Sequence, residues 1–214
     1  MLAANGIKVY IYTELMPTPC LSWAVRACKA QAGIMITASH NPAKYNGYKV
    51  YGEDGCQITL DVANTVIGKI NAVEMFGGAK VMDYEEGVKS GMISYIGADI
   101  IEAYYQKVLE QGIHTDLVAD SGLKVVYTPL NGTGNKPVRE ILKRIGIKEV
   151  TVVPEQENPD GNFPTCPFPN PEIKEALAKG LELCEKVKPD LLLATDPDCD
   201  RVGIAVPDNK NGGY

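Results

Sequence analysis

Two short segments of this sequence carry side chains that could do chemistry. The first is T-A-S-H-N-P at residues 37–42, which follows the apolar run G-I-M-I and places Ser39 among hydrogen-bonding side chains. The second is D-P-D-C-D-R at residues 196–201, which follows the apolar run L-L-L-A-T. Because Ser, Asn and Pro are all common in turns, the first segment is either a tight turn or a loop that displays the Ser39 hydroxyl for a reaction.

The second segment places three carboxylates at alternate positions, Asp196, Asp198 and Asp200. Anions this close repel one another unless a cation lies between them, and oxygen ligands suit a hard ion such as Mg²⁺. An EF-hand calcium loop also begins this way, but it needs Gly and Glu where this chain has Arg201 and Pro207. A solvated acidic turn stays open as a simpler interpretation. The position after an apolar strand, where α/β sheets bind ligands, favours a metal site.

Alternating strand and helix patterns would position these two segments. Ser39 follows a strand expected at 33–37, and the E-D-G turn at 53–55 predicts a hairpin between Y-K-V-Y-G and C-Q-I-T-L. Residues 77–97 hold several glycines and no sustained period, which indicates an irregular connection. The other elements expected in this half are a strand at 8–12 and helices at 18–30, 61–73 and 99–111, with Thr18 and Asp61 as N-caps.

The second half repeats strand and helix more regularly. We expect strands at 123–128, 149–154 and 191–195, helices at 137–145 and 171–187, a turn at N-G-T-G-N and a proline-rich loop over 155–170. The run at 191–195 is continuously apolar, which indicates a strand buried on both faces, as in a parallel sheet. The sequence therefore predicts two α/β domains with mixed, largely parallel sheets covered by helices, divided into residues 1–98 and 99–214.

Composition argues against several classes of function. The formal net charge of -6 and the pI near 5.0 do not fit the basic face of a nucleic-acid binder. No apolar stretch approaches the roughly 20 residues that span a bilayer, and the N-terminus lacks a signal-peptide pattern. The six cysteines form no C-x-x-C pair and fall mostly in apolar patterns. We therefore expect a soluble, cytoplasmic protein with reduced cysteines that binds neither nucleic acid nor membranes.

Taken together, the two segments resemble a known family. T-A-S-H-N-P with Y-N-G-Y-K after it, and D-P-D-C-D-R-V-G later in the chain, are similar to the phosphoserine loop and the metal-binding loop of the phosphohexomutase superfamily. This superfamily contains the phosphoglucomutases and phosphomannomutases. The stretches A-T-D-P-D-C-D-R-V-G-I-A-V and N-P-D-G-N-F-P-T-C-P-F-P-N-P-E resemble most the branch with bacterial phosphoglucomutases and a eukaryotic phosphopentomutase-like group.

The resemblance implies an incomplete enzyme. Family members have four domains around a central cleft, and this chain is similar to the later part of the first domain and most of the second. An N-terminal segment that bears an arginine, and the third and fourth domains with their sugar-binding and phosphate-binding loops, have no counterpart in the sequence. We expect the first α/β domain to be incomplete, domains 3 and 4 to be missing partners from a parent chain, and the fragment alone to be inactive.

The resemblance also assigns the chemistry. It implies an isomerase of the intramolecular phosphotransferase type, which interconverts hexose 1-phosphate and hexose 6-phosphate through a phosphoserine and a bisphosphorylated sugar. Ser39 would be the phosphorylated residue, and its phosphoryl oxygen would join Asp196, Asp198 and Asp200 as ligands of Mg²⁺. Glucose 1,6-bisphosphate would serve as activator and intermediate. The choice among glucose, mannose and pentose phosphates would depend on residues outside this chain.

Four further residues receive roles from the same resemblance. Lys49 falls at the position of the family's proposed general acid or base, where a nearby cation would lower its pKa; its pattern alone indicates a solvent-facing strand lysine. His40 joins the catalytic set and, with Asn41, would orient the phosphate or substrate. Arg201 would contact the phosphoserine region. We expect Ser39 Oγ to lie within a few ångströms of the aspartate loop, across the domain boundary.

Two other functions stay open. A non-catalytic module could bind metal and phosphate through the same loops. A metal-dependent phosphatase could use Asp196 as its nucleophile with Asp198 two positions on, although this would leave T-A-S-H-N-P without a role. A phosphoryl group on Ser39 would indicate the mutase, and one on Asp196 would indicate the phosphatase.

Overall fold

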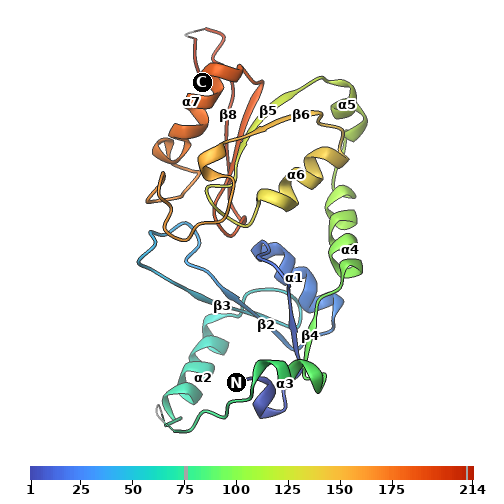
Figure 1. Cartoon of the computed structure of the whole chain (residues 1–214), viewed down its shortest axis with the longest axis vertical. Coiled ribbons are helices and arrows are strands. Elements are labelled where there is room, and N and C mark those ends of the chain that lie inside the picture. The colour runs from blue at the N-terminus through green and yellow to red at the C-terminus, as the bar shows by residue number, and fades with distance from the viewer. Residues whose placement is uncertain (75–76, 211) are drawn as a thin grey trace.

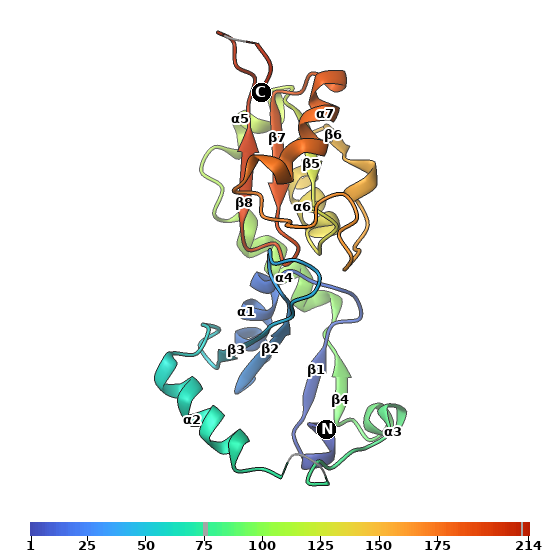
Figure 2. The same cartoon turned by 90° about the vertical axis from the view of Figure 1, so that its left-hand side faces the viewer.

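A computed structural model describes residues 1–74, 77–210 and 212–214. Figures 1 and 2 show an elongated molecule in which the two halves of the chain form two α/β parts, one above the other. This arrangement confirms the predicted fold class, whereas the division between residues 98 and 99 stays a prediction. No helix within the described ranges is both long and apolar enough to cross a membrane.

The second half is built on a four-stranded sheet with the strand order β6-β5-β7-β8. β5 (Lys124–Thr128), β6 (Glu149–Val152) and β7 (Leu191–Thr195) are parallel, and β8 (Val202–Ala205) runs antiparallel to β7. The connections from β5 to β6 and from β6 to β7 are helical crossovers, which return the chain to the same sheet in the same direction. The carboxyl ends of β5 and β7 therefore lie next to each other at one edge.

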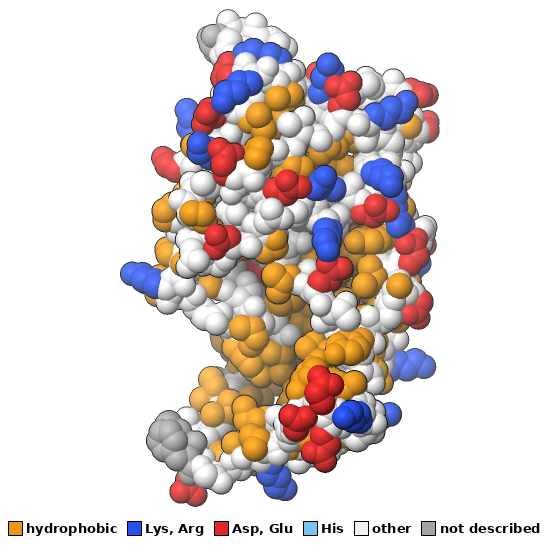
Figure 3. All heavy atoms as spheres, viewed as in Figure 1, with side chains coloured by type: hydrophobic (Ala, Val, Ile, Leu, Met, Phe, Trp, Pro, Cys, Tyr) orange, Lys and Arg blue, Asp and Glu red, His pale blue; other side chains and the backbone are white. Residues whose placement is uncertain are grey.

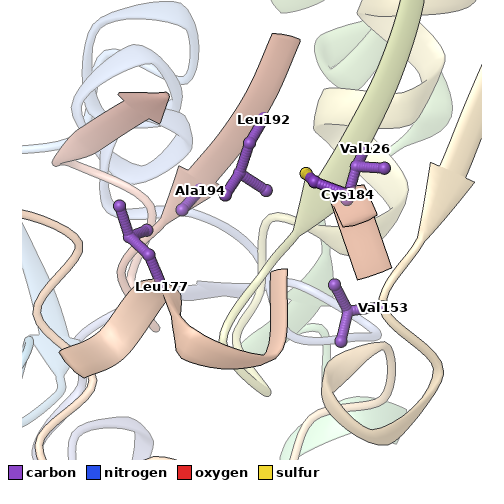
Figure 4. Packing of buried hydrophobic residues seen from close by; sticks show 6 residues of the cluster. All are labelled: Val126, Val153, Leu177, Cys184, Leu192 and Ala194. Atoms are coloured by element: carbon purple, nitrogen blue, oxygen red, sulfur yellow. The ribbon is translucent and has the colours of Figure 1, made fainter. Parts of the chain in front are cut away.

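The main core of this half lies between the sheet and α7 (Ala178–Val187), as Figure 4 shows. Its buried members are Val126, Val153, Leu177, Cys184, Leu192 and Ala194. The apolar stripe predicted over 171–187 is thus confirmed, but the helix begins later, as η3 (Lys174–Leu177) followed by α7. Ile173 is still extended, with φ of -109° and ψ of 142°, so the helical conformation starts only at Lys174. The half also contains α5 (Thr115–Asp120), α6 (Asn135–Arg144) and η2 (Pro154–Gln156).

The first half holds two separate two-stranded sheets. β1 (Val9–Ile11) pairs in parallel with β4 (Ile93–Tyr95), and β2 (Ala32–Ile36) pairs antiparallel with β3 (Tyr48–Gly52). The turn predicted around residues 53–55 is present, since the amides of Gly52 and Ile58 donate to the carbonyls of Cys56 and Val50 at 2.9 and 3.0 Å, but the strand expected after it is reduced to a single bridge between Tyr51 and Gln57. A short helix, η1 (Ala3–Asn5), precedes β1.

The prediction of an irregular connection over residues 77–97 is wrong for the second part of this segment. This segment contains α3 (Tyr84–Lys89), capped by the Asp83 side chain, and β4. β4 is only three residues long and pairs with β1, which lies far away in the sequence. A strand this short has too few residues for a periodic pattern, and only its long-range partner reveals it.

Two helices of the first half differ in how they are covered. α1 (Thr18–Ala27) buries Cys20, Ala24 and Val25, and ends earlier than predicted. α2 (Leu60–Asn71) has no buried residue, and its first residue is 81% exposed. Asp61 lies in the first turn of α2 instead of capping it. Figure 3 shows the hydrophobic side chains gathered on the lower part of the molecule, where this half is hollowed.

α4 (Ala98–Leu109) runs between the two halves and is attached to both (Figure 1). On one side, the indole Nε1 of Trp23 in α1 donates a hydrogen bond to the carbonyl of Ile100 at 3.0 Å. On the other side, the guanidinium of Arg144 in α6 donates to both carboxylate oxygens of Glu102 at 2.7 and 2.8 Å. These contacts attach α4 to one helix of each half, α1 and α6.

Candidate active site

Ser39 lies in the loop that leaves β2. Its backbone is in the left-handed region with φ of 53°, which is uncommon for a residue other than glycine, and its amide donates to Thr37 Oγ1 at 2.8 Å. The base of the loop is closed by Gly47, whose carbonyl accepts from the Thr37 amide at 3.1 Å. A Cβ at position 47 would lie 2.3 Å from the Thr37 carbonyl oxygen, so only glycine fits there. The loop is therefore a tight turn that also presents the serine hydroxyl.

The aspartate loop joins β7 to β8. Asp196 is fully buried and its Oδ1 accepts from the backbone amides of Asp200 and Arg201 at 3.1 and 2.9 Å, which folds the chain back on itself. Asp198 is 3% exposed, whereas Asp200 is open to solvent. The three carboxylates each place an oxygen within 4.8 Å of the others. This loop is therefore a compact anionic cluster.

The two loops meet across the junction of the halves. Ser39 Oγ donates to Asp196 Oδ2 at 3.2 Å, a contact between residues 157 positions apart in the sequence. The predicted proximity of Ser39 to the aspartate loop is thus confirmed as geometry. Lys49, from β3, adds a second link, since its ammonium donates to Asp198 Oδ2 at 2.8 Å and to Asp200 Oδ2 at 3.0 Å.

Among the described residues alone, the pKa of Lys49 is raised, and the lowering expected beside a bound cation stays a prediction. Burial alone would lower it, but the hydrogen bonds and charges of Asp198 and Asp200 outweigh burial and raise the pKa above its usual value. With its side chain 21% exposed, Lys49 is not the solvent-facing strand lysine that its pattern indicated. It lies in the site as a protonated counter-ion of the aspartates.

The pKa values of Asp196 and Asp198 are shifted in opposite directions. Burial and the neighbouring carboxylate of Asp198 raise the pKa of Asp196 to about 7. Burial also favours the protonated form of Asp198, but the hydrogen bonds from Lys49 and its other neighbours outweigh burial and lower its pKa. Below about pH 7, a proton therefore resides on Asp196 while Asp198 stays charged.

The donor set fits a hard divalent cation. Asp198 Oδ1 is buried and has no hydrogen-bond partner among the described residues. A buried carboxylate oxygen without a partner is costly, and a coordinated cation would supply that partner while offsetting the repulsion among the three aspartates. An all-oxygen set of this kind suits Mg²⁺. Asp196, Asp198 and Asp200 form a cluster that could hold such an ion.

The other predicted site residues, His40, Asn41 and Arg201, differ in how close they lie to Ser39 and the aspartate cluster. The Nδ1 atom of His40 is 3.2 Å from Ser39 Oγ, and its ring meets the edge of Phe168 with ring centroids 5.8 Å apart. Asn41 donates to the Ala38 carbonyl at 3.0 Å and so supports its own loop. The guanidinium of Arg201 donates to Glu172 at 3.0 Å, outside the Ser39 loop. Ligand roles for Asn41 and Arg201 stay predictions.

Sequence reasoning missed Thr18. Its Oγ1 donates to Asp198 Oδ2 at 3.0 Å and its amide donates to the Asp198 carbonyl at 2.9 Å. In the sequence, a threonine at the start of a helix is already explained by capping, but this side chain makes no cap hydrogen bond. The contact joins residues 180 positions apart, so no local pattern reveals it.

The turn N-G-T-G-N at 131–135 also supports the site. Thr133 donates from both its amide and its hydroxyl to the carbonyl of Pro197, at 2.8 and 3.0 Å. A Cβ on Gly132 would lie 2.3 Å from Pro197 Cα, so a side chain there would push the aspartate loop away. The turn after β5 thus packs directly against the loop after β7. This close packing explains the two glycines of the N-G-T-G-N turn better than a strand-to-helix turn alone.

Comparisons with known proteins agree with this geometry. Residues 102–212 match the family model described as phosphoglucomutase/phosphomannomutase, alpha/beta/alpha domain II, and residues 1–76 match the corresponding domain I model. A phosphoglucomutase of Staphylococcus saprophyticus is 38% identical over 204 residues, which cover 95% of this chain and 36% of that protein. A phosphoribomutase of Saccharomyces cerevisiae is 38% identical over 229 residues, with 98% of this chain and 36% of that protein covered.

The fold is shared with solved structures. The crystal structure of a putative phosphomannomutase from Thermus thermophilus superposes with a TM-score of 0.75 at 28% identity, over 96% of this chain and 43% of that one. The chain spans little more than a third of the length of the first two curated relatives. From the domain II match over residues 102–212 and these relatives, the chain belongs to the phosphoglucomutase/phosphomannomutase family.

Proposed function

We propose that this chain carries the phosphoserine and metal-binding part of an enzyme that interconverts hexose 1-phosphate and hexose 6-phosphate. The observation that supports this most is Ser39 Oγ at 3.2 Å from Asp196 Oδ2, with the Lys49 ammonium on the two neighbouring aspartates. Relatives named phosphoglucomutase, phosphoribomutase and phosphomannomutase favour sugar phosphates as the substrate class. Residues 1–98 and 99–214 would act as the two domains that bring these loops together.

The reaction consists of two transfers that mirror each other. A hydroxyl oxygen of the sugar phosphate attacks the phosphorus on Ser39, the bond from phosphorus to Ser39 Oγ breaks, and the sugar becomes a bisphosphate. The attacking hydroxyl releases its proton to water, and the Ser39 oxygen takes up a proton, which His40 Nδ1 at 3.2 Å would donate in the tautomer that carries its hydrogen there; the second transfer reverses both proton movements. In the second transfer, Ser39 accepts the other phosphoryl group, which leaves the isomeric monophosphate. Glucose 1,6-bisphosphate would be the intermediate and activator for glucose substrates.

Charge neutralisation is the main task of the surrounding residues, since phosphoryl transfer depends mostly on positioning and electrostatics. Asp196, Asp198, Asp200 and an oxygen of the phosphorylated Ser39 would hold Mg²⁺, which when bound offsets the negative charge of the transferring group. Lys49 is held protonated beside the same oxygens, so it can stabilise negative charge, and it would act as a general acid where a bound cation lowers its raised pKa. Asn41 and Arg201 would contribute to phosphate or substrate binding.

Intact-mass spectrometry after incubation with glucose 1,6-bisphosphate and Mg²⁺ tests the proposal. We expect an increase of about 80 Da that peptide sequencing locates on Ser39, and that disappears in Ser39→Ala. Ser121→Ala is the matched control, because this exposed hydroxyl lies at the end of α5, where it donates to the Val118 carbonyl and accepts from the Leu123 amide. A phosphoryl group on Asp196 would instead indicate the phosphatase. Absence of any phosphoryl adduct would favour a non-catalytic binding module.

A further inference from the structure

Thr18 is tied to a predicted metal ligand by two hydrogen bonds that no functional assignment uses. Its hydroxyl donates to Asp198 Oδ2 and its amide to the Asp198 carbonyl, at 3.0 and 2.9 Å. Both residues are almost fully buried, with 4% and 3% exposure. Little water can therefore compete for these bonds, which makes their loss costly.

We infer that Thr18 is a positioning residue: its hydroxyl orients the carboxylate of Asp198 for cation binding and links metal affinity to the docking of α1 on the aspartate loop. This inference rests on the proposed function, because it assumes a cation at the aspartate cluster. It adds a residue from the first half to a metal site whose ligand loop lies in the second.

The argument begins with the two oxygens of Asp198. Oδ2 accepts from Thr18 Oγ1 at 3.0 Å and from Lys49 Nζ at 2.8 Å, whereas Oδ1 is buried without a partner. Two donors on one oxygen restrict rotation of the carboxylate about its bond to the chain. They leave the other oxygen available within the cluster formed with Asp196 and Asp200. Hydrogen bonds of this type fix the orientation of metal ligands in proteins.

The hydrogen bond from the Thr18 amide to the Asp198 carbonyl does not depend on the Thr18 side chain. Thr18 is the first residue of α1, where amides have no partner inside the helix, and Pro19 has no amide hydrogen. The Thr18 amide is thus free to bind the Asp198 carbonyl, and any non-proline residue at position 18 can make this bond. Replacing the side chain therefore tests the hydroxyl while α1 keeps its main-chain attachment to the loop.

A titration with Mn²⁺, followed by electron paramagnetic resonance, measures the effect without any turnover. We expect Thr18→Val, which keeps the shape but lacks the hydroxyl, to bind Mn²⁺ about 10 to 100 times more weakly than the wild type. Thr18→Ser keeps the hydroxyl and should bind close to the wild-type affinity. Thr65→Val is the matched control, because the exposed Thr65 hydroxyl only donates to the Asp61 carbonyl within α2.

The outcomes separate the inference from the proposed function. Equal Mn²⁺ affinities for wild type and Thr18→Val, or an equal loss in Thr18→Ser and Thr18→Val, would overturn the role of the hydroxyl. A wild-type chain that binds no Mn²⁺ would overturn the metal part of the proposed function as well. If circular dichroism shows that Thr18→Val is unfolded, Thr18→Ala replaces it, since a smaller side chain cannot clash, and the same loss is expected.

Discussion

The positive charge of Lys49 offsets the repulsion among the three aspartates. Lys49→Gln removes the ammonium from Asp198 and Asp200, whose side chains are 4% and 31% exposed. Because hydrogen bonds to charged groups are among the strong ones, we expect the free energy of unfolding in EDTA to fall by about 1.5 to 3 kcal/mol, measured by urea denaturation. Addition of Mg²⁺ should recover part of this loss.

Lys107→Gln provides the control for that experiment. Lys107 pairs with Glu110 on the surface of α4, and both side chains are 54% exposed. Water screens such a pair, so its removal should cost less than about 1 kcal/mol. An equal effect of the two substitutions would show that the Lys49 ion pair is no stronger than a surface contact.

Asp196 predicts how stability depends on pH without metal. Its pKa in the folded chain is raised to about 7, so between its ordinary value near 4 and about 7 the folded state holds a proton that the unfolded state does not. The stability from this proton is lost as pH rises through about 7. In EDTA, the urea midpoint should therefore fall between pH 6 and pH 8, and Asp196→Asn should reduce that fall. An unchanged slope in Asp196→Asn would assign the pH dependence to other groups.

Residue types predicted the two loops but not all the residues that support them. The three aspartates were found from their spacing, and Ser39 from its flanking hydrogen-bonding side chains together with the family resemblance of the two segments. Thr18 and Gly132 were not, because a capping threonine and a turn glycine are ordinary in sequence and their partners lie far along the chain. The raised pKa of Lys49 likewise depends on carboxylates 149 and 151 positions away.

Among the elements, the turn between β5 and α6 controls the position of the aspartate loop. In Gly132→Ala the added Cβ would meet Pro197 Cα at 2.3 Å and the Pro197 carbonyl oxygen at 2.5 Å. These are backbone atoms, so the loop must shift. We expect a loss of about 1 to 3 kcal/mol in urea denaturation and weaker Mn²⁺ binding.

Gly68→Ala is the control for that substitution, since a Cβ at this position in α2 would meet nothing within 4 Å. Alanine is preferred over glycine inside a helix by about 0.5 to 1 kcal/mol, so this variant should be as stable as the wild type or more stable. If Gly132→Ala behaved in the same way, the aspartate loop would have to be free to move.

The helices were easier to predict than the sheets of the first half. Apolar residues at helical spacing located α1, α2 and α4, and Pro137 and Gly146 marked the ends of α6, whereas the short helices α3 and α5 were not predicted. β4 and the pairing of β3 with β2 depend on contacts between distant segments, which a single sequence does not encode locally. The parallel direction of β5, β6 and β7 followed correctly from the alternation of strands and helices, whereas their spatial order was not predicted.

At the scale of the whole molecule, the chain spans 36% of the two relatives at 38% identity, so we expect it not to turn over substrate alone. Incubation with glucose 1-phosphate, Mg²⁺ and glucose 1,6-bisphosphate should produce no glucose 6-phosphate, measured with a coupled dehydrogenase assay. The full-length phosphoglucomutase of Staphylococcus saprophyticus is the positive control. Sustained formation of glucose 6-phosphate by the chain would contradict the prediction.

The hydrogen bond from Ser39 to Asp196 has a further consequence for the proposed cycle. An unmodified Ser39 attracts the aspartate loop by donating its proton, whereas a phosphorylated Ser39 has no proton to donate and carries a charge near -2. The same contact then changes from attraction to repulsion unless a cation joins the two loops. The distance between the Ser39 loop and the aspartate loop would therefore change with the phosphorylation of Ser39. The junction between the halves would widen and narrow once in each catalytic cycle.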